Sequence, residues 1–139
     1  KKKDENNKYM MECLPKSLPS LLFARRIQER ASELNFDWRE IEPIWTKIEE
    51  EIDELKEAIS SKNQDEIEEE FGDLLFSLVN LSRFLKVNPE EALKITNRKF
   101  VQRFQKVEES ADNSNKNLSE MSLQELDQLW DKAKDSENK

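Results

Sequence analysis

Several residue types are absent or scarce in this chain of 139 residues. It has no histidine, one cysteine (Cys13) and one glycine (Gly72). The usual ligands of zinc are therefore missing, which leaves carboxylate oxygen as the ligand for a metal. A single cysteine excludes an intramolecular disulfide and favours a reducing compartment, so we expect a cytoplasmic protein. One glycine and four prolines allow few tight turns, which indicates a largely helical chain.

Long apolar segments and excess positive charge are also missing. No apolar run of about 18 residues occurs, so we expect no transmembrane helix, and no signal peptide is recognisable. The net charge of -8 argues against a nucleic-acid backbone as partner. Small phosphates stay possible, because a bound cation and a local basic cluster can reverse the potential at one site. We therefore expect neither nucleic acid nor a membrane as partner.

Helical periodicity and capping residues predict an all-α chain with five helices. Apolar residues recur at helical spacing, and Pro43 suits a first helical turn. Asn88 followed by Pro89 is a typical helix start, and Ser122 with Glu125 forms a capping box. The expected helices are Ser20–Leu34, Glu42–Ser60, Asp65–Leu85, Pro89–Glu108 and Leu123–Ala133. We expect one helical domain at 20–134, a flexible tail and linker at 1–19, a flexible loop at 111–117 and a disordered tail at 135–139.

The second and third of these segments are rich in acids placed beside their apolar stripes. At roughly 100° per residue, Glu51 and Glu54 lie about 60° apart on one flank of the first stripe. Glu70 and Asp73 have the same relation on the next helix. If the two helices pack antiparallel, four carboxylates meet at one seam.

Such a seam has two interpretations. Like charges raise one another's pKa and destabilise the fold, and a divalent cation removes that cost; oxygen ligands alone suit Mg²⁺ or Mn²⁺. Acids make up 31 of the 139 residues, however, so pairs three residues apart also arise by chance on a solvated face. Spacing alone leaves both interpretations open.

Other motifs add a resemblance to a known family. Glu50-Glu51-x-x-Glu54 followed by Glu70-x-x-Asp73 resembles the EExxE…ExxD signature of the MazG family of nucleoside triphosphate pyrophosphohydrolases. The similarity covers about residues 14–134 and is to the C-terminal catalytic half of two-repeat bacterial MazG proteins, with 14–20 as the linker from an N-terminal repeat. The further matching segments are IQERA at 27–31, FDW at 36–38, GDLLF at 72–76, VNL at 79–81, NRKF at 97–100 with Arg103, and LWDKAK at 129–134.

The resemblance implies a fold, an activity and a metal site. The fold is an antiparallel helical bundle, and the activity is Mg²⁺-dependent hydrolysis of nucleoside triphosphates to monophosphate and pyrophosphate, with Mn²⁺ as a substitute. It implies Glu51, Glu54, Glu70 and Asp73 as metal ligands. Glu50 is a candidate general base or outer ligand, although its helical position points it away from the seam.

The resemblance also implies residues that bind the substrate. Lys99 and Arg103 share a helix face, which is normally solvated, and here they would contact the triphosphate. Trp130 and Lys134 would close over the nucleotide, with the last helix acting as a lid. Two further candidates, Asn80 and Asn97, would orient phosphate or ribose.

Several alternatives stay open at this point. The chain could be a non-catalytic helical dimerisation module, or a pyrophosphohydrolase of narrower substrate range, dUTPase-like or of the phosphoribosyl-ATP type. Trp38 is either a packing anchor or a base-stacking residue. Arg25, Arg26 and Arg30 form either a solvated face or a phosphate contact. The helix from Asp65 is apolar nearly all the way round, which predicts a homodimer or a dimer of dimers.

Overall fold

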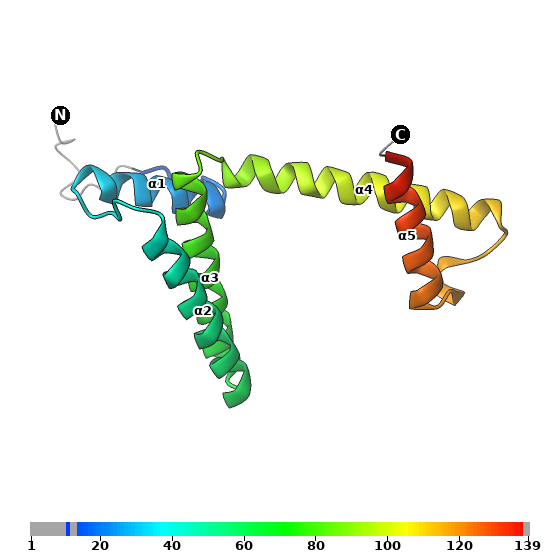
Figure 1. Cartoon of the computed structure of the whole chain (residues 1–139), viewed down its shortest axis with the longest axis horizontal. Helices are drawn as coiled ribbons and strands as arrows, with labels where there is room; N and C mark the ends of the chain where they lie inside the picture. The colour runs from blue at the N-terminus through cyan, green and yellow to red at the C-terminus, as the bar shows by residue number, and fades with distance from the viewer. Residues whose placement is uncertain (1–10, 12–13, 138–139) are drawn as a thin grey trace. The chain divides into compact units, whose positions relative to one another are not determined.

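The computed structural model describes Met11 and residues 14–137, so Cys13 lies outside the described residues. Over this range it is built from helices, with no strand, and the predicted all-α class is confirmed (Figure 1). Every predicted helix start is met to within one residue. The elements are α1 (Ser20–Glu33), α2 (Glu42–Ser61), α3 (Gln64–Phe84), α4 (Pro89–Asn113), the 3-10 turn η2 (Leu118–Glu120) and α5 (Leu123–Glu137).

The chain divides into two compact units, one up to Glu90 and one from Glu91 onward. The first contains α1, α2 and α3, and the second contains most of α4 together with α5. The units are described separately below, so the single domain expected at 20–134 stays a prediction. None of the helices in the described ranges combines the length and the apolar character needed to cross a membrane.

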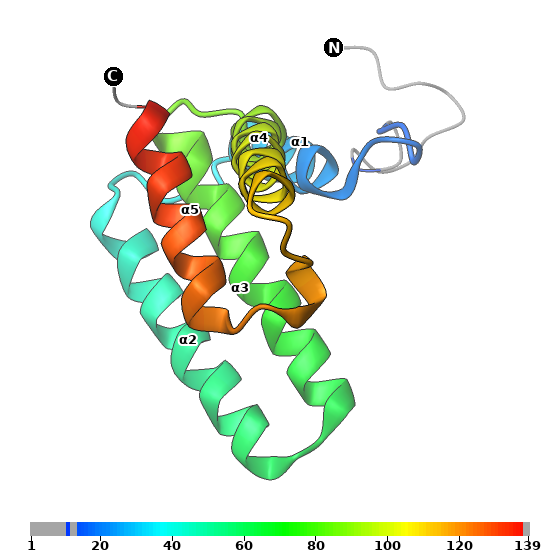
Figure 2. The same cartoon turned by 90° about the vertical axis from the view of Figure 1, so that its right-hand side faces the viewer.

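Helices α2 and α3 form an antiparallel hairpin (Figure 2). Lys62 ends α2 in the left-handed conformation, with φ 58°. Asn63 then caps α3, because its side-chain oxygen accepts from the backbone N–H groups of Asp65 at 3.1 Å and Glu66 at 3.3 Å. Acids in the first turn of α3 also suit the positive end of the helix dipole. This short turn places the acidic flanks of the two helices opposite each other.

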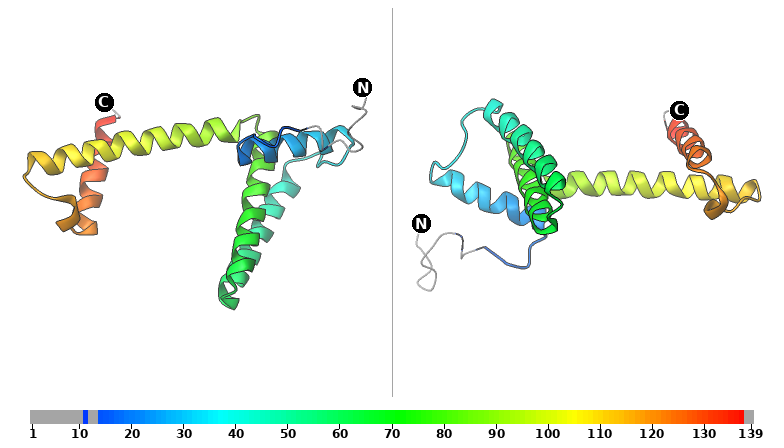
Figure 3. Two further views of the ribbon diagram at one scale, coloured as in Figure 1. Left: turned by 180° about the vertical axis from the view of Figure 1, so that it is seen from behind. Right: turned by 90° about the horizontal axis from the view of Figure 1, so that it is seen from below.

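The apolar core of the first unit lies between the hairpin helices. Ile44 and Ile48 of α2 pack with Leu81 of α3, and all three are buried. Helix α1 packs on α3 at the end of the hairpin away from the turn at 61–64 (Figure 3). Gln28 of α1 donates from Nε2 to the backbone carbonyl of Phe76 at 2.9 Å, and this bond ties the two helices together.

The segment between α1 and α2 is held to α3 by an ion pair. Asp37 accepts from Arg83 Nη1 at 3.0 Å, and the second oxygen of Asp37 accepts from Nη2. Arg83 also donates to Asn80 Oδ1, from Nη2 at 2.8 Å. Two planar groups that share two hydrogen bonds have little freedom to turn, so this pair fixes the position of the segment that carries Phe36 and Trp38.

Helices α4 and α5 both end later in the sequence than predicted. Helix α4 continues past Glu108 to Asn113, because Ala111 is buried rather than part of a flexible loop. Helix α5 continues past the predicted end at Ala133 to Glu137. Glu137 accepts from Arg103 Nε at 3.0 Å, and Ser136 accepts from Lys106, so contacts with α4 order the last turn. The predicted capping box is confirmed by the reciprocal hydrogen bonds of Ser122 and Glu125.

Candidate functional site

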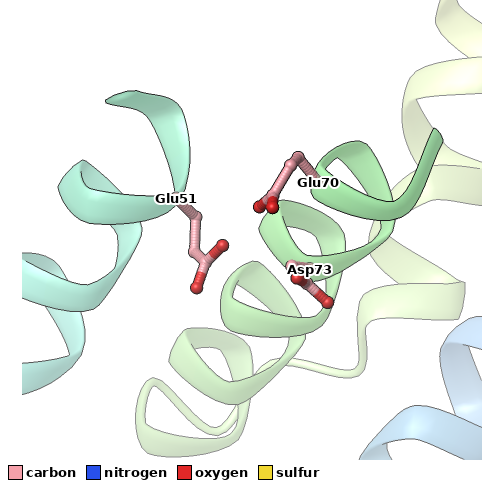
Figure 4. Close-up of side chains that lie close together, drawn as sticks. All are labelled: Glu51, Glu70 and Asp73. Atoms are coloured by element: carbon pink, nitrogen blue, oxygen red, sulfur yellow. The ribbon is translucent and has the colours of Figure 1, made fainter. Parts of the chain in front are cut away.

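Three carboxylates meet at the seam of the hairpin. Glu51 comes from α2, and Glu70 and Asp73 come from one face of α3, one turn apart (Figure 4). Each offers an oxygen, and these oxygens all lie within 4.8 Å of one another. Glu51 is only 4% exposed because it faces the partner helix. The antiparallel hairpin thus brings acids of both helices together, as the spacing predicted. Three of the four expected carboxylates are close enough to contact one ion.

Two oxygens of this cluster lack hydrogen-bond partners. Glu51 accepts a salt bridge from Lys47 Nζ at 2.9 Å through Oε1, while its Oε2 is buried and, within the described residues, unpaired. Glu70 Oε2 is in the same condition. A buried acceptor without a partner destabilises the fold, and more so when it is charged. Oxygen donors from three acids, two of them unsatisfied, fit a hard divalent cation such as Mg²⁺ or Mn²⁺.

The electrostatics of the cluster agree with this fit. Removal from water, followed by the neighbouring Glu54 carboxyl and the charges of Asp73 and Glu51, raises the pKa of Glu70 to about 6. The hydrogen bond and charge of Glu51 raise the pKa of Lys47, so that ammonium stays protonated beside the seam. The seam therefore concentrates negative charge with one lysine as its nearest cation.

Glu54 and Glu50 differ from the central three acids. Glu54 lies close enough to Glu70 to raise its pKa, but its oxygens are outside the set within 4.8 Å. Glu50 is exposed, and its nearest basic group is Lys47 Nζ at 3.9 Å. The cluster does not include Glu50, as its position on the helix predicted.

A cavity of about 750 Å³ opens beside the acids in the first unit. Glu51, Asp73 and Lys47 line it, together with Asn80, a predicted substrate residue. Trp38 also lines it while 47% exposed, which leaves its indole accessible to a ligand. Sequence reasoning missed Lys47 here, although its spacing of four residues from Glu51 is the usual signal for an ion pair along a helix.

The remaining predicted substrate residues belong to the second unit and are described there on their own. Trp130 packs on Phe100, with ring centroids 5.1 Å apart, and the Arg103 guanidinium lies 5.9 Å from the Trp130 ring centre. Arg103 is also paired with Glu137. The other three side chains are exposed, namely Asn97, Lys99 and Lys134.

The arginines of α1 form ion pairs along their own helix. Arg25 and Arg26 both lie within salt-bridge distance of Glu29, and Arg30 pairs with Glu33 at 3.7 Å. Such pairs three and four residues apart are typical of a solvated face. Arg25 is partly buried and also donates to the Val87 carbonyl at 3.2 Å, so all three arginines already have partners within the first unit.

Comparisons with known proteins agree with the geometry. Residues 39–108 match the family described as the MazG nucleotide pyrophosphohydrolase domain, and this match includes the whole acid cluster. The nucleoside triphosphate pyrophosphohydrolase/pyrophosphatase MazG of Thermotoga maritima is 56% identical over 117 residues, which are 84% of this chain and 45% of that protein. The nucleoside triphosphate pyrophosphohydrolase of Escherichia coli strain K12 is 37% identical over 131 residues, or 91% and 49% of the two chains. An uncharacterized protein of Bacillus subtilis, YabN, is 40% identical over 138 residues, 99% of this chain and 28% of its own.

The hairpin and its cluster define a class of protein: an all-α fold with a carboxylate site suited to a divalent cation. The family match assigns the chain within that class. It belongs to the MazG nucleotide pyrophosphohydrolase family. The chain spans about half the length of the first two relatives named above.

Proposed function

We propose that the chain hydrolyses nucleoside triphosphates to monophosphate and pyrophosphate with Mg²⁺, for which Mn²⁺ can substitute. The observation that carries the proposal is the acid cluster on α2 and α3, with unpaired buried oxygens on Glu51 and Glu70. The names of the Thermotoga and Escherichia coli relatives state this class of activity for those proteins.

In this proposal Glu51, Glu70 and Asp73 hold the cation, and Glu54 completes the set from its edge. When bound, a divalent cation would supply positive charge for the phosphates and lower the pKa of a water, chemistry that suits cleavage between the α- and β-phosphates. Lys47 pairs with one oxygen of Glu51 and leaves the other available to the cation. A proton on Glu70 competes with the cation, so Glu70 must be ionised for activity.

Lys99 and Arg103 would neutralise phosphate charge, and Trp130 with Lys134 would cover the nucleotide. Arg103 is already bonded to Glu137, so the phosphates would have to replace that carboxylate. Both ligands are anionic oxygens that a guanidinium can hold through two parallel bonds, which makes the exchange chemically reasonable. The lid role of α5 and the phosphate or ribose contacts of Asn80 and Asn97 also stay proposals.

Pyrophosphate release from a panel of nucleotides tests the activity. The panel contains the common ribo- and deoxyribonucleoside triphosphates, dUTP and phosphoribosyl-ATP, which covers the narrower substrate ranges. Release from several triphosphates with Mg²⁺, and none after chelation, is the expected result. No release from any of them, with no rise of the melting temperature at millimolar Mg²⁺, would favour the non-catalytic module.

We also propose that the chain assembles as a homodimer or a dimer of dimers in the cytoplasm. Large apolar side chains on the hairpin are exposed within the described chain, which a second copy would cover. They are Trp45, Ile52, Ile59, Phe71, Leu75 and Leu78. Light scattering after size-exclusion chromatography tests this, because a single chain has a mass of 16.5 kDa. A mass of one chain at micromolar concentration would contradict it.

A further inference from the structure

Outside the acid cluster, the buried amide of Gln28 is an unusual polar group. The residue is 7% exposed, and its Oε1 has no hydrogen-bond partner in the part of the chain that the structure describes. Its Nε2 donates to the Phe76 carbonyl at 2.9 Å. Because a carbonyl can only accept, the nitrogen must face Phe76, and the oxygen must point the other way. The packing of α1 on α3 thus fixes an acceptor without a donor.

Gln28 lines the same cavity of about 750 Å³ as Glu51 and Asp73. A largely apolar hollow with a few fixed polar groups is the usual form of a small-molecule site. An acceptor in such a wall destabilises the protein unless a ligand or a water donates to it. The apolar parts of the wall are Ile27, Ala31, Phe36, Trp38, Ile44 and Phe76.

Asn80 presents the opposite hydrogen-bonding group to this cavity. Its Oδ1 accepts from Arg83 at 2.8 and 3.3 Å, which leaves Nδ2 to donate. Arg83 is itself held by Asp37, so the orientation of the Asn80 amide is fixed as well. Two residues that line the cavity therefore carry amides held by neighbours, Gln28 with a buried acceptor to spare and Asn80 with a donor to spare. This pattern suits the edge of a heterocycle that carries an N–H beside an acceptor.

We infer that Gln28 Oε1 accepts a hydrogen bond from an N–H group of the substrate's base and is a specificity-determining residue. The inference rests on the proposed function, because it takes the cavity beside the acids as the place of the nucleotide. Adenine and cytosine carry an exocyclic amino group, and guanine and uracil carry a ring N–H, on the pairing edge. Gln28 therefore accepts all four bases and selects against analogues whose pairing edge lacks an N–H.

A pair of substrates that differ by one amino group tests the inference. Purine riboside triphosphate is ATP without the amino group of adenine. From the usual worth of a neutral hydrogen bond, the wild type should prefer ATP in kcat/KM by about 3- to 10-fold. Gln28→Met has a similar length without hydrogen-bonding groups, and it should bring the ratio close to one. Gln64→Met is the matched control, because Gln64 is exposed at the start of α3, and it should keep the wild-type ratio.

Two results with ATP and purine riboside triphosphate would overturn the inference. One is a wild type that hydrolyses both substrates equally, which needs no variant and so stands even where Gln28→Met fails to fold. The other is a Gln28→Met protein that loses activity on both while keeping the preference, because that result assigns Gln28 to structure alone. A ribose hydroxyl is a second possible donor, so ATP and 2′-deoxy-ATP are compared as well. A Gln28→Met variant that loses the preference for ribose but not for the amino group would also overturn it.

Nucleoside binding separates this inference from the proposed function. Calorimetric titrations with adenosine and with purine riboside are run without phosphate or Mg²⁺. The wild type should bind adenosine more tightly than purine riboside, and Gln28→Met should bind the two equally. That preference without pyrophosphate release from any nucleotide would refute the activity and keep the role of Gln28. Suppose instead that pyrophosphate is released, but the wild type neither prefers ATP to purine riboside triphosphate nor binds adenosine more tightly than purine riboside. That result would refute the role of Gln28 and keep the activity.

Discussion

Replacing Asp73 by asparagine tests the cation site most directly. Asparagine keeps the shape of the side chain and removes one charge from the set that lies within 4.8 Å. Without metal, Asp73→Asn should be as stable as the wild type or slightly more so, because the Asp73 charge acts against ionised Glu70. With metal, the variant should lose most of the stabilisation that the wild type gains.

The size of the loss follows from binding linkage. At a Mg²⁺ concentration about 100 times its Kd, the wild type gains about 2.7 kcal/mol. For a chain of this size that gain raises Tm by roughly 8–11 °C. Even changes next to metal ligands weaken affinity by about 10–100-fold, and removing a ligand should do at least as much. At the same concentration the variant then gains about 1.4 kcal/mol or less, which is half of the wild-type rise or below.

Thermal unfolding followed by circular dichroism measures this difference. Scans with MgCl₂ are compared with scans in NaCl of equal ionic strength, which removes general screening. Asp53→Asn is the matched control, because Asp53 is an exposed aspartate of the same hairpin outside the cluster. A full Mg²⁺-dependent rise in Asp73→Asn, or an equal loss in Asp53→Asn, would refute the assignment of these acids as ligands.

The other predictions concern pH and the second unit. Since the pKa of Glu70 is raised from 4.5 to about 6, its contribution to metal-free stability is fully present below pH 4.5 and is lost as pH rises through about 6. In urea unfolding, Glu70→Gln should remove this fall of the free energy of unfolding between pH 4.5 and about 6. An unchanged dependence of that free energy on pH would contradict the assignment to Glu70. Lys99→Ala and Arg103→Ala should each weaken triphosphate binding by a similar factor for every base in calorimetry; a change confined to one base would refute a phosphate role. Trp130→Ala should lower Tm, because it removes the contact with Phe100, and should weaken nucleotide binding by roughly 1–3 kcal/mol. A lower Tm with unchanged affinity would assign Trp130 to packing and exclude the lid.

Features set by local spacing could be predicted from the sequence. The seam of Glu51, Glu70 and Asp73 follows from residues three apart on two helices and a short turn between them. The helix starts follow from local residues such as Pro43 and Asn88. These signals lie within a few residues of one another, so they do not depend on the rest of the fold.

Features set by contacts distant in sequence could not be predicted. Gln28 meets the Phe76 carbonyl only because α1 packs on α3, and an amide in a helix carries no signal of that packing. The extra turn of α5 depends on Arg103 and Lys106 of another helix. The outlying position of Glu54 depends on how the two hairpin helices are rotated about their axes, which spacing within one helix leaves undetermined.

The hairpin has a further consequence for the order of folding. The clustered acids are close together in the sequence, because they lie on neighbouring helices joined only by Lys62 and Asn63. Contacts this local form early, because closing a short loop costs little entropy. The acids therefore repel one another while most of the chain is still unfolded, and a divalent cation would relieve that repulsion in the transition state. Mg²⁺ should then speed folding more than it slows unfolding, and stopped-flow refolding of the wild type and of Asp73→Asn would show whether the acceleration depends on the seam.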